Sequence, residues 1–345
     1  MKTIHVEASK SYDILIGTGL LKDAGNQLLS VLKKPCKVVI ISDSNVFPIY
    51  GGILENSLSN AGFTAIHYVF PAGESSKNGR TYLNILNFLA KNQMTRSDTL
   101  VALGGGVTGD MCGFAAATYL RGISYVQIPT TLLAMVDSSV GGKTAIDLPA
   151  GKNLVGAFYQ PRLVLCDLDT LSTLPTTVFS DGCAEVIKYG VLYDTDLFAH
   201  LSQQGLDFNR EMIVSRCVEL KRDVVMEDEY DTGARQKLNL GHTIGHSIET
   251  LSDFTITHGQ AVAIGMAIIS KAGCRAIYED LIAVLKKFNL PTSTEFSASE
   301  LYSNALSDKK RSGGTVNLII PQAIGNCAIV PTDVDQLESF IKEGL

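Results

Sequence analysis

The order of apolar and polar positions divides the chain into two halves of different texture. In the first half, short apolar runs rich in β-branched residues alternate with longer amphipathic stretches. Such alternation of strand-like and helix-like segments is typical of a parallel sheet covered by helices. We predict strands at 37–43, 65–70, 98–103, 124–128 and 163–166.

From about Thr176 onward, apolar residues recur with a helical period at roughly 181–201, 209–227, 234–251 and 258–279. A late hairpin-like element pairs 315–320 with 327–330. At 345 residues the chain is long for one hydrophobic core. We therefore predict an α/β N-terminal domain with a parallel sheet, residues 1–177, and a mostly α-helical C-terminal domain, residues 178–345. The cleft between two such domains is where we expect a site.

Composition and charge exclude several classes of protein. Hydrophobic residues make up 46% of the chain and charged residues 19%, an ordinary globular balance. A formal net charge of -6 disfavours a nucleic-acid partner. The N-terminus lacks a basic segment followed by an apolar run, and no stretch reaches the length of a membrane span, so we expect a cytoplasmic protein. The seven cysteines never form a C-x-x-C pair, which argues against disulfides and a thiolate zinc site.

A glycine-rich turn follows the predicted strand that ends at Leu103. The segment Gly104–Asp110 contains G-x-G-x-x-G at the start of a helical stretch, where glycines let the backbone approach a pyrophosphate. The usual acidic residue about 20 positions downstream is missing, but Asp43 ends an upstream strand and could accept a ribose hydroxyl. The alternative is a tight turn without a ligand. A second polar loop, 71–77, also follows a strand.

Histidines cluster in the second half of the chain. Asn239, His242 and His246 are spaced three and four residues apart, so on one helix they share a face. Without the Glu of H-E-x-x-H this is no metalloprotease signature, and solvated or core histidines are the alternative. Glu185 and Lys188 lie among aliphatic residues on a predicted buried helix, either as a helical ion pair or, for Glu185, as a partner of a divalent cation. One carboxylate and two imidazoles would make a catalytic zinc site.

A glycine-punctuated stretch carries further polar side chains. With later cations these side chains could converge on a doubly anionic ligand, since Arg suits carboxylates and Lys suits phosphates. Taken singly, each Lys is better explained as solvated surface than as part of a site. The residues are Asp137, Lys143, Lys152, Asn153, Lys221, Arg235, Lys309 and Lys310.

Several motifs together resemble the 3-dehydroquinate synthases, a family of sugar-phosphate cyclases. They are Gly104–Asp110, Gly141–Thr144, Gly151–Leu154, Ala184–Gly190, Leu238–His246 and His258–Met266. The resemblance covers nearly the whole chain. It implies an NAD-binding α/β domain, a helical domain with one divalent metal ion, zinc or cobalt, and a homodimer. It also implies conversion of 3-deoxy-arabino-heptulosonate 7-phosphate into 3-dehydroquinate and phosphate, in the shikimate pathway, with NAD reduced and reoxidised in one turnover.

The resemblance also implies roles for individual residues. The metal ligands become Glu185, His242 and His258, which moves His246 to the substrate site. Substrate contacts are Asp137, Lys143, Asn153, Lys188, Lys221, Arg235, Asn239, His246 and Lys309 or Lys310, with Arg121 from a partner subunit. NAD contacts are Asp43, Gly73, Glu74, Ser75, Ser76, Lys77, Gly105, Gly106, Val107, Thr108, Gly109, Asp110, Thr130, Thr131, Lys143, Lys152, Thr170, Leu171, Ser172 and Thr173. Gln260 stands where the family usually has Glu.

Two other enzyme functions and one non-enzymatic function stay open at this point. A glycerol-dehydrogenase-like polyol oxidoreductase shares the plan of an α/β half and a helical half, but it consumes NAD and does not need phosphate-binding cations. A sibling sugar-phosphate cyclase would act on a different substrate. An NAD-sensing or scaffold protein has little reason to carry a metal triad and a cationic site.

Overall fold

The computed structural model describes residues 1–309 and 314–345, and its contacts divide the chain into two compact units. The first unit comprises 1–174 and 210–230, and the second comprises 175–209 and 231–345. Each is described by itself. The segment 210–230 belongs by its contacts to the first unit, although it follows the predicted division at 177 in the sequence. That division of the chain into two sequence segments stays a prediction.

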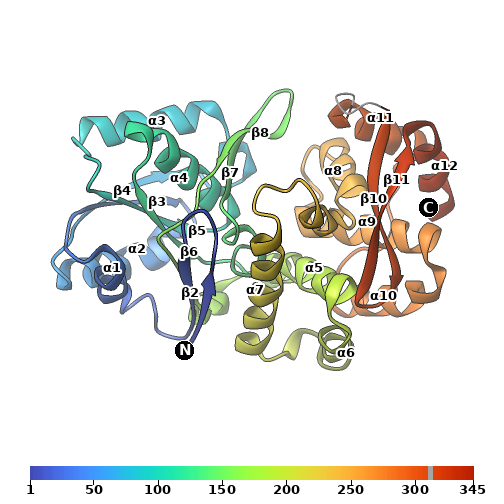
Figure 1. The fold of residues 1–345 in the computed structure, drawn as a ribbon, viewed down its shortest axis with the longest axis horizontal. Helices are drawn as coiled ribbons and strands as arrows, with labels where there is room; N and C mark the ends of the chain where they lie inside the picture. The colour runs from blue at the N-terminus through green and yellow to red at the C-terminus, as the bar shows by residue number, and fades with distance from the viewer. Residues whose placement is uncertain (310–313) are drawn as a thin grey trace. The chain divides into compact units, whose positions relative to one another are not determined.

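The first unit is built on a seven-stranded sheet with the order β1-β2-β9-β6-β5-β3-β4 (Figure 1). All neighbouring strands are parallel except β1 and β2. The five predicted strands are confirmed, and the bounds of β3 agree with the prediction at both ends. The strands are β1 (Lys2–Val6), β2 (Tyr12–Gly17), β3 (Lys37–Asp43), β4 (Thr64–Phe70), β5 (Thr99–Gly104), β6 (Ser124–Pro129) and β9 (Leu163–Asp167).

The inner strands β3, β5, β6 and β9 are buried on both faces, which explains why they are nearly continuous apolar runs rather than alternating ones. Along β3, Val38 and Ile40 pack with α1 (Ala24–Leu32) and α2 (Phe47–Asn60) on one face. Val39 and Ile41 pack on the other face with α3 (Gly79–Lys91) and α4 (Gly106–Thr118). This alternation follows from the two-residue period of a strand.

The apolar pattern did not predict one hairpin of the first unit, and although it predicted the helix at 209–227, it did not show that this helix packs here. A hairpin of β7 (Lys143–Leu148) and β8 (Gly151–Phe158) occupies the glycine-punctuated stretch, with Lys143 opposite Phe158. The helix α7 (Arg210–Glu227) packs against β1, where the Nζ atom of Lys2 lies 2.6 Å from Glu219. It also packs against the short π-helix η3 (Ala134–Ser138).

The second unit is mostly helical, as predicted. Its helices are α5 (Thr176–Tyr193), α6 (Thr195–Gln204), α8 (His242–Leu251), α9 (His258–Gly273), α10 (Arg275–Lys287), α11 (Ala298–Lys309) and α12 (Val334–Gly344). The predicted hairpin is confirmed as β10 (Thr315–Ala323) and β11 (Asn326–Asp333) (Figure 1). The α9 helix packs against α5, α8, α10 and α12. None of the helices in the described residues is both long enough and apolar enough to cross a membrane.

Some predicted helical stretches are broken where a residue caps a new helix. Asp194 separates α5 from α6, and its carboxylate accepts the backbone N–H of Leu197 at 2.9 Å. Between the short 3-10 helix η6 (Ala234–Asn239) and α8, Gly241 adopts a φ of 79°. The prediction that Asn239 shares one helix with His242 and His246 is therefore wrong, because the left-handed backbone at Gly241 ends the earlier turn.

Candidate active site

Three predicted metal ligands of the second unit converge. The Nε2 atoms of His242 and His258 each lie 3.5 Å from Oε1 of Glu185. One ligand atom from each of these residues can be chosen so that all three lie within 4.8 Å of one another. Glu185 is fully buried in α5, while the two histidines are the first residues of α8 and α9. The starts of α8 and α9 and the middle of α5 therefore build the group.

Glycine allows α8 and α9 to approach each other near this group. A Cβ atom at Gly265 would lie only 2.1 Å from the carbonyl oxygen of Gly241. Any side chain at Gly265 would therefore push the start of α8 away from α9. Because His242 directly follows Gly241, this close contact also fixes where its imidazole begins.

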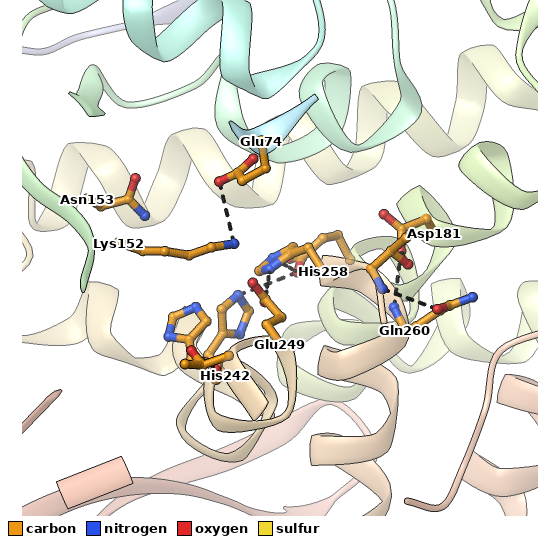
Figure 2. Close-up of polar contacts among 12 residues, drawn as sticks. Glu74, Lys152, Asn153, Asp181, His242, Glu249, His258 and Gln260 are labelled. Atoms are coloured by element: carbon orange, nitrogen blue, oxygen red, sulfur yellow. Dashed lines mark hydrogen bonds and ion pairs between the residues drawn. The ribbon is translucent and has the colours of Figure 1, made fainter. Parts of the chain in front are cut away.

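The other ring nitrogen of each histidine has an acceptor of its own. Nδ1 of His242 lies 3.0 Å from the carbonyl oxygen of Leu240, and Nδ1 of His258 lies 2.7 Å from Oε1 of Glu249. Figure 2 shows His258 and Glu249 pointing toward each other. A proton donated from Nδ1 to such an acceptor leaves the lone pair on Nε2, which is the nitrogen that faces Glu185.

The pKa values of the two imidazoles are shifted in opposite directions. Burial, followed by the positive charge of Lys188, lowers the pKa of His242 from its ordinary value to about 3. Burial also acts to lower the pKa of His258, but its hydrogen bonds to Glu185 and Glu249 outweigh burial and raise that pKa to about 10. The group without a metal therefore carries one imidazolium at neutral pH, and a bound cation would have to replace its proton.

The ion pair within α5 and the candidate metal group occur together. The Nζ atom of Lys188 contacts Oε2 of Glu185, and both side chains are buried. Oε1 of the same carboxylate faces the two imidazoles. One carboxylate oxygen and two oriented imidazoles match the ligands of a catalytic zinc or cobalt site, which keeps positions open for substrate. These side chains therefore fit a divalent cation.

His246 lies near the metal group, but its ring is not grouped with Glu185. Its ring centroid is 5.4 Å from that of His242 and 6.1 Å from that of His258. The group that includes Glu185 takes His242 and His258, whereas His246 falls into a second possible group with Glu249 and His258. The substrate role of His246 stays a prediction.

The glycine-rich turn of the first unit lies where the sheet changes direction. From β3 the chain proceeds through α2 to β4 at the edge, whereas from β5 it proceeds through α4 to β6 on the other side. The carboxyl ends of β3 and β5 are therefore the topological switch point, where open α/β sheets bind ligands. Asp43 ends β3, and Gly105 precedes the first turn of α4.

Local contacts show that the backbone of this turn packs closely against the sheet. A Cβ atom at Gly109 would lie 2.7 Å from Oε1 of Gln127 on β6, so the third glycine of the motif lets α4 pack closely on the sheet. The backbone N–H of Thr130 donates to the carbonyl of Gly104 at 3.0 Å. Oδ1 of Asp43 accepts two N–H groups of the turn that leads to α2, and Thr108 donates to Oδ2 at 3.3 Å.

Several segments predicted to bind NAD or substrate meet at Lys77. Its Nζ atom lies 2.6 Å from Oδ2 of Asp110 on α4 and donates to Oδ1 of Asn153 on β8 at 2.6 Å. Beside this contact, Nζ of Lys152 lies 3.4 Å from Oε1 of Glu74 (Figure 2). Burial lowers the pKa of Lys77, but Asp110 and Glu74 outweigh it and raise that pKa overall. The loop at 73–77, the start of α4 and the β7–β8 hairpin thus form one charged cluster.

Another ion pair of the first unit joins α7 to the π-helix η3. The Nζ atom of Lys221 contacts Oδ1 of Asp137 on η3. Both are predicted substrate contacts, and sequence spacing of more than 80 residues gave no sign of their proximity. The grouping of α7 with the first unit explains it.

Other predicted residues lie apart from these clusters or outside the description. Thr170 and Thr173 contact Tyr50 of α2, through the carbonyl oxygen at 3.1 Å and the hydroxyl at 2.6 Å. Arg121 is exposed in the turn after α4, and Lys143 is exposed at the start of β7. In η6, Arg235 is buried and Asn239 is exposed. The side chain of Lys309 and the whole of Lys310 lie outside the described residues.

Comparison with known proteins gives family matches over most of the chain. One family model, described as 3-dehydroquinate synthase N-terminal, matches residues 67–181, and a second, described as 3-dehydroquinate synthase C-terminal, matches residues 182–311. A 3-dehydroquinate synthase of Streptococcus suis (strain 05ZYH33) is 44% identical over 344 residues, which cover 96% of this chain and 97% of the relative. The chain belongs to the 3-dehydroquinate synthase family.

Solved structures extend the likeness of this 3-dehydroquinate synthase family member to other cyclases. A crystal structure of 2-deoxy-scyllo-inosose synthase complexed with carbaglucose-6-phosphate, NAD+ and Co2+ covers 100% of both chains, with a TM-score of 0.87 and 26% identity. The 2-epi-5-epi-valiolone synthase from Streptomyces hygroscopicus subsp. jinggangensis 5008, with NAD+ and Zn2+ bound, covers 98% of both chains, with a TM-score of 0.88 and 25% identity.

Two acidic residues near the metal group were not predicted for this family member. Glu249 contacts His258, and Oδ1 of Asp181 accepts the backbone N–H of Gln260 at 3.1 Å at the start of α9 (Figure 2). Gln260 itself completes a capping box with Thr257. The only sequence signal for either acid is a carboxylate among apolar residues of a helix. Asp181 lies one turn before Glu185, and Glu249 lies two turns after His242.

Proposed function

We propose that this chain is a 3-dehydroquinate synthase of the shikimate pathway, a lyase that converts 3-deoxy-arabino-heptulosonate 7-phosphate into 3-dehydroquinate and phosphate. The carboxylate and two oriented imidazoles of Glu185, His242 and His258 carry the proposal, in a chain 44% identical to a named synthase over nearly its whole length. The reaction has no net oxidation, because hydride removed from the substrate returns to it. NAD is therefore required but not consumed.

For the cofactor, we propose that NAD binds the first unit at its switch point. Two structural relatives contain NAD+. The N-terminus of α4 offers N–H donors and a favourable dipole to a pyrophosphate. Asp43 would accept a hydrogen bond from a ribose hydroxyl. The charged cluster of Glu74, Lys77, Asp110 and Lys152 would lie at the border of the same site. When bound, NAD supplies a hydride acceptor and donor.

For the metal, we propose that Glu185, His242 and His258 hold one divalent ion, zinc or cobalt. These ions occur in the two structural relatives. The ion would supply Lewis acidity to the oxygen that is oxidised and reduced. Lys188 holds the second oxygen of Glu185, and Leu240 and Glu249 hold the imidazoles, so this chain orients all of the proposed ligands.

For the substrate, we propose that the predicted cationic and amide side chains bind the carboxylate and the phosphate of the heptulosonate phosphate. Arg235 offers a planar fork suited to the carboxylate, and lysines suit the phosphate as point charges. Lys188 and Lys221, each held by a carboxylate, would contact hydroxyls and relay protons. Asp137, Lys143, Asn153, Asn239, His246 and Lys309 complete the proposed set. A homodimer in which Arg121 reaches the partner's site, and a cytoplasmic location, are part of the same proposal.

A polyol oxidoreductase is the rival that the experiment must exclude. The protein is loaded with zinc and NAD and is offered the heptulosonate phosphate or glycerol in separate reactions. We expect phosphate and 3-dehydroquinate from the first substrate and no NADH from the second. NADH formation from glycerol without phosphate release from the sugar acid would overturn the proposal. Release of phosphate from a different sugar phosphate alone would favour a sibling cyclase.

A further inference from the structure

Glu249 is a buried carboxylate with a specific contact to a proposed metal ligand. It lies on α8 and is 1% exposed. An ionised carboxylate in such a place is stable only when it is paired and hydrogen-bonded. Its Oε1 atom lies 2.7 Å from Nδ1 of His258, which is within the range of a charge-assisted hydrogen bond.

The position of Glu249 in the sequence suits this contact. It lies seven positions after His242 on the same helix, which is close to two full turns, so both side chains leave α8 on one face. The α8 helix packs against α9, which begins at His258. One helix therefore presents a proposed ligand at its start and a support for another proposed ligand two turns later.

We propose that Glu249 is a positioning residue that accepts the Nδ1 hydrogen of His258 and thereby holds Nε2 toward Glu185 and His242. The inference rests on the metal assignment of the proposed function. Rotation of the His258 ring would break the contact to Glu249, and the other tautomer would place a hydrogen on Nε2, where a lone pair is needed.

The two imidazoles differ in what orients them. His242 faces the neutral carbonyl oxygen of Leu240 at 3.0 Å, whereas His258 faces a carboxylate at 2.7 Å. A backbone carbonyl cannot be removed by substitution, but Glu249 can. A carboxylate also makes the imidazole more basic, so its loss should weaken the bond from His258 to a cation.

A second cation is the competing explanation for the buried carboxylate. Ligand atoms of His246, Glu249 and His258 also lie within 4.8 Å of one another. Such a cation would need Nδ1 of His258 as a ligand, and that nitrogen cannot at the same time carry the hydrogen donated to Glu249. The number of ions bound per chain therefore separates the two explanations.

The test compares Glu249→Ala and Glu249→Gln with the parent and with Glu279→Gln, an exposed carboxylate on α10 that changes the net charge equally. Zinc affinity of the metal-free proteins is measured by competition with a chromophoric chelator. The visible spectrum of the Co2+ form reports ligand geometry. We expect one ion per parent chain and an affinity loss of about 10- to 100-fold in Glu249→Ala. The Co2+ spectrum should also change.

Glu249→Gln should lose less affinity than Glu249→Ala, because its amide oxygen can still accept the Nδ1 hydrogen without the charge. Glu279→Gln should match the parent. Parent-like affinity and spectrum in both Glu249 variants would overturn the inference, and so would two ions per parent chain. Should Glu249→Ala fail to fold, parent-like behaviour of Glu249→Gln alone overturns it. No ion on the parent would instead refute the metal assignment of the proposed function.

Discussion

Gly259 offers the sharpest structural test of how α5 and α9 hold the metal group. It is the second residue of α9, directly after His258. A Cβ atom built there would lie 2.0 Å from the backbone carbonyl oxygen of Asp181 on α5. Asp181 precedes Glu185 by one helical turn, so the clash acts between the segments that carry two proposed ligands.

The cost follows from the size of the overlap. Ordinary van der Waals contact requires about 3.5 Å, so in Gly259→Ala the start of α9 must retreat by more than 1 Å. A backbone atom cannot move aside as a side chain can. Overpacking of this kind costs about 1–3 kcal/mol. Binding a metal would have to draw the helices back together against that strain, which predicts an affinity loss of about 5- to 150-fold.

The assay is chelator competition on metal-free protein, with Gly52→Ala as the matched control. Gly52 lies in α2, and a Cβ atom there meets nothing within 4 Å. The control should keep the parent's metal affinity and gain slightly in stability, because alanine favours a helix. A Gly259→Ala protein whose metal affinity lies within twofold of the parent would refute the reasoning.

Two further predictions concern charge. Arg235→Lys should weaken binding of the heptulosonate phosphate by about 1.5–3 kcal/mol and leave NAD affinity nearly unchanged, because Lys lacks the planar fork. The measurement is calorimetry of substrate binding with NAD bound. An unchanged substrate affinity would show that Arg235 does not bind the substrate. Metal binding at pH 6.5 should release about one proton per ion, since the pKa of His258 is raised to about 10 and that of His242 is lowered to about 3. The affinity for the metal should therefore rise with pH from neutral toward 10. A titration with metal in weak buffer that releases no proton, or two protons per ion, would contradict this.

The sequence predicted those features that depend on local pattern. The apolar run of β3 was recognised at both ends because a buried parallel strand is continuously apolar. The glycine turn was recognised because its spacing reflects close packing of α4 on the sheet, as Gly109 against Gln127 shows. Glu185 attracted notice as a carboxylate on an apolar helix, and it is indeed fully buried.

Other features depend on contacts that local pattern cannot show. The β7–β8 hairpin was missed because its glycines and exposed positions weaken the strand period, with exposed and half-buried residues mixed along β8. A helical period does not say which unit a helix packs against, so the local pattern could show neither the place of α7 nor the ion pair of Lys221 with Asp137. Glu249 has no motif spacing relative to His258, and only the packing of α8 on α9 brings them together.

The most direct test of the proposed function counts phosphate and NADH in one reaction. Zinc-loaded protein is mixed with NAD at the enzyme's own concentration and a large excess of 3-deoxy-arabino-heptulosonate 7-phosphate. Free phosphate and absorbance at 340 nm are then followed together. A synthase that returns its hydride should release many phosphates per NAD with no net accumulation of NADH. NADH that accumulates in step with product, or phosphate release that stops after one turnover per NAD, would contradict the account.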